Sequence, residues 1–144
     1  MTKTIVCSSV FIRHNDVLCV LAVQRGKNAR IHNNERCVPG GHVEGIGEDI
    51  ASAALRELYE ETNLALQLHQ ISPLNIEQEC LHKGFVIHNY YSHLDSLDCI
   101  SVNNCNCEPY EIKDVRWLPV TEVDNYVWAF SLQKDTIKTL AKAL

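Results

Sequence analysis

One segment, from Asp49 to Thr62, constrains the fold of this chain more than any other. Its apolar residues recur with the spacing of a helix, because Ile50, Ala54 and Leu58 stand at i, i+4 and i+8. The segment begins with an acidic side chain, which suits the free backbone N–H groups of a first turn. Asn63 follows the last turn, and Asn tolerates the left-handed conformation that ends many helices. The sequence therefore predicts an amphipathic helix whose apolar stripe packs on another layer.

The opposite side of this predicted helix is acidic. Glu57, Glu60 and Glu61 stand at i, i+3 and i+4, so their three carboxylates share one patch. Like charges this close repel one another, and a bound cation relieves the repulsion. Magnesium prefers carboxylate oxygens and keeps waters that a phosphate can displace. Taken alone, three such glutamates favour a solvated helix surface, so the interpretation as a metal site depends on the residues around them.

Strands surround the predicted helix. Two apolar runs, Thr4–Phe11 and Val17–Gln24, are separated by the turn residues 14–16 and predict a β-hairpin. Further strands are predicted at Gly84–His93 and Val115–Leu118, a short helix at Thr121–Tyr126, and a terminal helix at Leu132–Leu144 with Leu132, Thr136, Leu140 and Ala143 on one side. This mixed order predicts an α/β or α+β sandwich.

Composition narrows the function classes. A chain of 144 residues suits one domain, residues 1–144, and its net charge of −5 argues against a general nucleic-acid binder. Neither a secretory signal nor a membrane span is visible, so we expect a cytoplasmic protein. Seven cysteines, an odd number without an export signal, favour free thiols over disulfides. Cys7 and Cys19 lie in apolar runs and are expected to be small buried hydrophobes.

The residues around the three glutamates form a recognisable motif. Gly41-His-Val-Glu-Gly-Ile-Gly-Glu48, seven further residues and Arg56-Glu-Leu-Tyr-Glu-Glu-Thr-Asn-Leu64 resemble the Nudix box, G-x5-E-x7-R-E-U-x-E-E-x-G-U, in which U is aliphatic. The flanking segments 38–42 and 115–119 are similar to the same family. Six residues rather than five separate Gly41 from Glu48, and Asn63 replaces the glycine of the motif. The longer loop leaves open how well Glu48 reaches Arg56.

The resemblance implies a fold and a metal site. The fold would be α/β, a Nudix-type α/β/α sandwich with a mixed β-sheet. Glu57, Glu60 and Glu61 would bind Mg²⁺, with Mn²⁺ as a possible substitute, and the Gly41 carbonyl would add a further oxygen. Glu57 could alternatively deprotonate the attacking water, while Arg56 and Glu48 would form an ion pair that orients the box.

Residues outside the helix complete the expected site. In some family members a carboxylate from a later loop is the base, and Glu111 is the first candidate for that role, with Glu108 as its competitor. Arg25, at the end of a predicted strand, is the first choice for holding substrate phosphates, and His42 is the second. Several aromatic residues could stack a base, although aromatics in strands are more often core: Phe85, Tyr90, Tyr91 and Trp128.

The implied activity is hydrolysis of a phosphoanhydride bond in a nucleoside diphosphate derivative. The leading hypothesis is a MutT-like nucleoside triphosphate pyrophosphohydrolase that releases a monophosphate and pyrophosphate. Alternatives are hydrolysis of ADP-ribose, a nucleotide sugar or a dinucleoside polyphosphate, an isomerase acting on an isoprenoid diphosphate, and a non-catalytic Nudix-fold nucleotide-binding module. The expected partner is a small-molecule nucleotide, with neither nucleic acid nor membrane, and the protein is expected to be a monomer or a homodimer.

Overall fold

The computed structural model describes residues 3–27, 34–45, 47–74, 78–80, 84–95, 101–104, 106–107 and 111–144. Its elements, in chain order, are β1 (Lys3–His14), β2 (Val17–Arg25), β3 (Arg36–Cys37), β4 (Gly40–His42), α1 (Ile50–Thr62), the 3₁₀ helix η1 (Leu68–Gln70), β5 (Ser72–Pro73), β6 (Gln78–Cys80), β7 (Phe85–Leu94), β8 (Ile112–Pro119), the 3₁₀ helix η2 (Val120–Asn125) and α2 (Ser131–Ala141).

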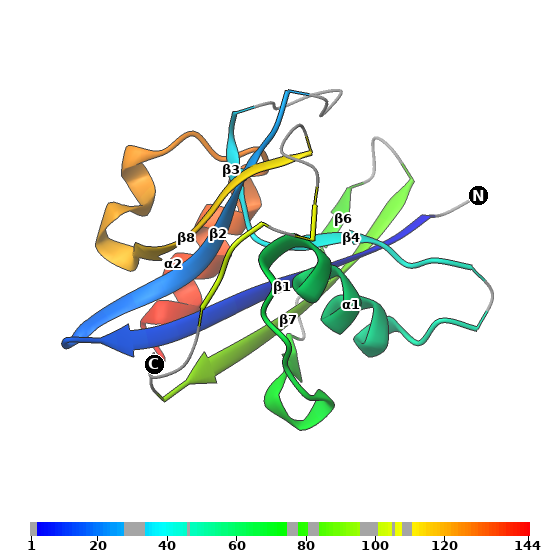
Figure 1. Ribbon diagram of the computed structural model, residues 1–144, viewed down its shortest axis with the longest axis horizontal. Helices are drawn as coiled ribbons and strands as arrows, with labels where there is room; N and C mark the ends of the chain where they lie inside the picture. The colour runs from blue at the N-terminus through cyan, green and yellow to red at the C-terminus, as the bar shows by residue number, and fades with distance from the viewer. Residues whose placement is uncertain are drawn as a thin grey trace.

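The strands form one mixed sheet in which β3, β2, β1, β7 and β5 follow one another (Figure 1). β1 pairs antiparallel with β2 and β4 and parallel with β7, while β8 pairs antiparallel with β2. The predicted hairpin is confirmed, because Asn15 and Asp16 join β1 to β2 with φ values of 50° and 64°. Asn and Asp are favoured in such two-residue turns, where φ is positive.

The two helices cover opposite faces of the sheet (Figure 1). On β2, Val20 packs in one cluster with Ile137 of α2, whereas Leu21 packs in another with Leu58 of α1. Because successive side chains of a strand point to opposite faces, α1 and α2 must lie on different sides. The fold is therefore an α/β/α sandwich with a mixed sheet, and the predicted fold class is confirmed.

Helix α1 follows its sequence prediction closely. The Asp49 side chain accepts a hydrogen bond from the Ser52 backbone N–H at 3.2 Å and caps the first turn. Asn63 ends the helix in the left-handed conformation at a φ of 63°. The buried side contains Ala54 and Leu58, as the periodicity predicted.

The predicted apolar side of the terminal helix is wrong at two positions. Leu132 is 53% exposed, and Ala143 lies beyond the end of α2 and is exposed. Instead Ile137 and the polar Gln133 are buried. Gln133 can be buried because its side-chain oxygen accepts a hydrogen bond from the Val38 backbone N–H at 3.0 Å, which satisfies both groups.

The expected burial of Cys7 and Cys19 is confirmed, at 7% and 8% exposed. Both are free thiols. Among the described residues, no helix has the length and apolar character needed to span a membrane.

Candidate active site

Two glycines of β4 allow the acidic side of α1 to approach the sheet. A Cβ atom on Gly41 would lie 2.5 Å from the carboxyl carbon of Glu57, so only glycine leaves room for that carboxylate. A Cβ atom on Gly40 would collide with the backbone oxygen of Val6 on β1. The Gly40 backbone N–H donates to Glu61 Oε1 at 2.8 Å. The glycine pair therefore places two of the three predicted metal ligands.

Arg56 joins the box loop to the glutamates of α1. Its Nε and Nη2 atoms donate to the two carboxylate oxygens of Glu48 at 2.7 and 3.1 Å, so Glu48 does reach Arg56 across the longer loop. Its Nη1 atom donates to Glu57 and Glu60 at 3.1 Å each. The hydrogen bonds from the Arg56 guanidinium lower the pKa of Glu48. Such a fork of fixed donors restricts where the carboxylates can point.

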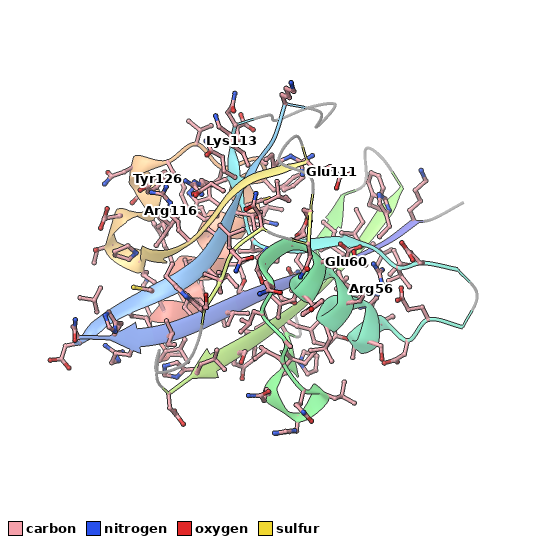
Figure 2. All side chains as sticks on the ribbon, in the orientation of Figure 1. Arg56, Glu60, Glu111, Lys113, Arg116 and Tyr126 are labelled. Carbon is pink, nitrogen blue, oxygen red and sulfur yellow. The ribbon has the colours of Figure 1, made fainter. Side chains whose placement is uncertain are left out.

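A cavity of about 220 Å³ opens beside these carboxylates. It is lined by Arg25, Glu57, Glu60, Glu61, Cys107, Glu111 and Ile112. Figure 2 shows Glu60 on α1 and Glu111 immediately before β8. The Gly26 backbone N–H donates to the Glu111 carbonyl at 2.8 Å, which fixes the backbone at Glu111 beside the end of β2. The structure therefore brings together most of the residues that the sequence singled out.

Two carboxyl groups of the cavity, those of Glu61 and Glu57, have raised pKa values. Burial raises the pKa of Glu61 to about 8, an effect that the hydrogen bond from Gly40 opposes and the neighbouring Glu57 adds to. Burial also raises the pKa of Glu57, whereas the adjacent Arg56 opposes that shift. Without a cation, Glu61 is therefore mostly protonated at neutral pH. A buried carboxyl with a raised pKa in a cavity is typical of a functional site.

The donor set fits a hard divalent cation. Three carboxylates line one cavity, and oxygen ligands of this kind suit magnesium or manganese. Among the described residues, no three Asp, Glu, His or Cys side chains are already arranged closely enough to hold a metal ion together. The reason is visible in the hydrogen bonds, because Arg56 engages Glu57 and Glu60 while the Gly40 N–H engages Glu61. Cation binding would have to compete with these contacts.

The two residues expected to hold substrate differ in their placement. Arg25 lines the cavity, and its Nε atom is buried without a hydrogen-bond partner among the described residues. The His42 side chain does not line the cavity; it is exposed and its ring centroid lies 6.0 Å from that of Phe85. His42 contributes its backbone carbonyl, which accepts from Arg56 Nη2 at 3.1 Å. Glu108, the competitor of Glu111, lies outside the described residues.

Two residues that the sequence did not assign to this site also line the cavity. Cys107 places its Sγ atom 2.8 Å from the Glu60 carbonyl, and Ile112 begins β8 beside it. Burial raises the pKa of Cys107 to about 12, so its thiol stays protonated. Neither residue belongs to the motif or to a periodic apolar pattern, so only the tertiary structure could place them.

A family comparison agrees with this geometry. The model of the NUDIX domain matches residues 3–141. This chain belongs to the Nudix family. Its MutT-like box, identified from sequence alone, is thus part of a domain match that covers nearly the whole chain.

One curated relative shares a short, similar stretch. The m7GpppN-mRNA hydrolase NUDT17 of Xenopus laevis is 52% identical over 48 residues, which cover 33% of this chain and 16% of that protein. The match therefore spans less than a fifth of the relative's length.

Solved structures share the whole fold at low identity. The NUDIX domain of Shewanella oneidensis NrtR, complexed with ADP ribose, superimposes with a TM-score of 0.81 at 20% identity and covers 99% of this chain and 88% of that one. A C. elegans Ap4A hydrolase superimposes with a TM-score of 0.72 at 16% identity and covers 98% and 96%. At such identities these likenesses establish the Nudix fold alone.

Proposed function

We propose that this Nudix domain hydrolyses a phosphoanhydride bond in a nucleoside diphosphate derivative with the help of a divalent cation, magnesium first and manganese as a substitute. One observation carries the proposal: Glu57, Glu60 and Glu61 line the same cavity as Arg25. The three carboxylates favour cations, and the guanidinium favours the phosphate of a substrate. A diphosphate needs both, because it must be neutralised and oriented at the same time.

The residues of the chain divide the reaction between them. Glu57, Glu60 and Glu61 would hold the cations together with the Gly41 carbonyl, and Arg25 would hold a phosphate. When bound, the cations would neutralise the diphosphate and lower the pKa of a nearby water. Water attacks phosphorus in line, the bridging P–O bond breaks, and the departing phosphate leaves with the bond's electron pair. The water's proton passes to a carboxylate.

Two carboxylates are candidates for this base. Glu57 is hydrogen-bonded to Arg56 at 3.1 Å, whereas Glu111 lines the cavity as an exposed residue. Glu57→Gln would remove both a ligand and a base, but Glu111→Gln would remove only a base. A base role for Glu111 therefore requires that its variant lose kcat while its affinity for the cation is unchanged.

Arg56 and Glu48 are positioning residues in this proposal. Their paired hydrogen bonds, at 2.7 and 3.1 Å, hold the guanidinium where it meets Glu57 and Glu60. Loss of the Glu48 carboxylate would free the guanidinium to turn, so the metal ligands would lose their fixed geometry.

Nucleoside triphosphates are the first substrate class that we propose, with release of a monophosphate and pyrophosphate. A second candidate follows from the NUDT17 relative, whose name describes cleavage of an mRNA cap, also a nucleoside diphosphate derivative. The exclusion of nucleic acid, based on the net charge of −5, therefore stays a prediction, as does the monomeric or homodimeric state. ADP-ribose, nucleotide sugars and dinucleoside polyphosphates remain alternatives.

A substrate panel with one carboxylate variant tests the proposal. Hydrolysis of the four common nucleoside triphosphates, ADP-ribose, Ap4A and m7GpppG would be measured with magnesium and with a chelator. We expect Glu60→Gln to lower kcat by about 100-fold or more on the preferred substrate. Glu122→Gln, which alters an exposed glutamate on η2, is the matched control and should retain full activity.

Unchanged hydrolysis in Glu60→Gln would contradict the metal-site account. Binding of nucleotides without any hydrolysis would instead favour the alternative from a different class, a non-catalytic Nudix-fold binding module. The box carboxylates are all present in this chain, which supports the enzyme over the binding module.

A further inference from the structure

Phe130 stands at the start of α2, where the preceding segment is attached to the sheet. The Arg36 backbone N–H donates to the Val127 carbonyl at 2.8 Å, and the Ala129 N–H donates to the Arg36 carbonyl at 2.8 Å. These bonds add residues 127–129 alongside β3 as a short parallel extension of the sheet. Phe130 is therefore presented from a fixed backbone, although it lies in the connection to α2.

The Phe130 ring lies next to the proposed phosphate ligand. The guanidinium carbon of Arg25 is 5.8 Å from the ring centroid, within the range of a cation–π contact. Arg25 also lines the carboxylate cavity. The ring is nevertheless 43% exposed, which is high for a phenylalanine. Arg25 thus lines the cavity and also contacts an aromatic ring that is partly exposed to solvent.

We propose that Phe130 is the platform on which the base of the substrate nucleotide stacks. This inference rests on the proposed function, because it assumes that the diphosphate lies among Glu57, Glu60, Glu61 and Arg25. A nucleotide joins its base to its phosphates through a single sugar, so the base must bind beside the phosphate site. Phe130 touches the residue at that border, and stacking on an aromatic ring accepts any base.

Three of the four aromatic residues considered from sequence are less suitable. Trp128 is 9% exposed and its Nε1 donates to the Val123 carbonyl at 2.7 Å, so it belongs to the core. Phe85 lies beside His42, away from the cavity lining, and Tyr91 lines a separate hollow with residues of η1. Sequence reasoning passed over Phe130 because it lies in no strand and in no motif.

Binding of an uncleavable nucleotide tests this platform directly. Titration calorimetry with magnesium would compare α,β-methylene ATP, which has a base, with methylenediphosphonate, which has none. We expect Phe130→Leu to weaken binding of the nucleotide by about tenfold, and to leave binding of the diphosphonate unchanged. Phe130→Trp should bind the nucleotide at least as tightly as the unmodified protein, because it keeps an aromatic face.

Leu68→Ala is the matched control, since Leu68 is 58% exposed on η1 and does not line the cavity. Nucleotide binding by Phe130→Leu that equals the unmodified protein would overturn the platform. Equal loss of both probes would also overturn it, because the effect would then act through Arg25 or the fold.

The platform and the proposed function can fail separately. If hydrolysis depends on Glu60 and is unchanged by substitution of Phe130, the stacking role of Phe130 is contradicted and the proposed hydrolase activity is supported. If binding depends on the base and on Phe130, but no substrate is hydrolysed, the stacking role of Phe130 is supported and the proposed hydrolase activity is contradicted.

Discussion

At the residue scale, the carboxylate of Glu57 packs so closely against Gly41 that no side chain fits at this position. A methyl group there would lie 2.5 Å from the carboxyl carbon of Glu57. In Gly41→Ala we therefore expect Glu57 to be displaced and kcat to fall about 100-fold, as for a misplaced catalytic group. Steady-state kinetics on the preferred substrate would measure this, with a melting temperature as the control for folding. Full activity in a folded Gly41→Ala would contradict the placement of Glu57.

Glu61 links metal binding to pH. Its pKa is raised to about 8 in the folded protein, so the folded state holds this proton more tightly than the unfolded chain does. The resulting stability is present below the ordinary carboxyl pKa of about 4.5 and is lost as the pH rises through about 8. In a chelator, we expect thermal stability to decline between pH 5 and pH 8, and Glu61→Gln to flatten this decline.

The same proton competes with the cation. Magnesium binding must displace it below pH 8, so the affinity for magnesium should increase from pH 6 to pH 8. Stabilisation by magnesium should increase in parallel, because a ligand that binds only the folded state raises its stability. Magnesium affinity that is constant over this range would contradict a buried, protonated Glu61.

At the element scale, the end of α1 explains a departure from the family motif. Asn63 adopts the left-handed conformation that glycine usually provides, and its side-chain oxygen also accepts a hydrogen bond from Asn106 Nδ2 at 2.9 Å. The same Asn106 amide donates to the Tyr59 carbonyl at 3.1 Å. The side chain thus ties the segment that carries Cys107 to the helix that carries the glutamates.

Replacing Asn63 should therefore loosen one wall of the cavity. In Asn63→Gly the backbone conformation is retained but the contact with Asn106 is lost, so we expect faster amide hydrogen exchange at Cys107. Asn63→Asp keeps the acceptor oxygen and is the matched control. Equal exchange rates in the glycine variant and the unmodified protein would show that the side chain does not hold this segment.

Sequence predicted these elements unequally. The hairpin and α1 carry local signals, a pair of turn residues and a helical period, and both were found where expected. Strand β4 has only three residues, two of them glycines, and exists because it pairs with β1. Such a strand reflects tertiary contacts rather than local preference, so the sequence indicates no more than a short strand end at residues 38–41 that runs into a glycine turn.

At the scale of the whole molecule, Gln133 connects the α2 layer to the site. Its side-chain oxygen accepts from the Val38 backbone N–H at 3.0 Å, two residues before the glycine pair. Gln133→Leu would leave that buried N–H without a partner, at a cost of about 1–3 kcal/mol in the free energy of unfolding. Urea denaturation would measure the change. A variant as stable as the unmodified protein would show that another group satisfies Val38.

The arrangement of the layers explains what sequence could and could not predict about the site. Glu57, Glu60, Glu61 and Arg56 share one helix, so their grouping follows from spacing alone. Arg25 and Glu111 come from distant parts of the chain, and only the family resemblance suggested them. The contact of Phe130 with Arg25 depends on residues 127–129 running beside β3, which no local pattern encodes.

The central claim is that three glutamates of α1 gather divalent cations beside a diphosphate. Crystals grown with Mn²⁺ and α,β-methylene ATP would test it most directly through the anomalous signal of manganese. The account predicts anomalous peaks at about 2.0–2.3 Å from carboxylate oxygens of Glu57, Glu60 or Glu61, with the diphosphate as a further ligand. A bound nucleotide with no anomalous peak at these carboxylates would contradict it.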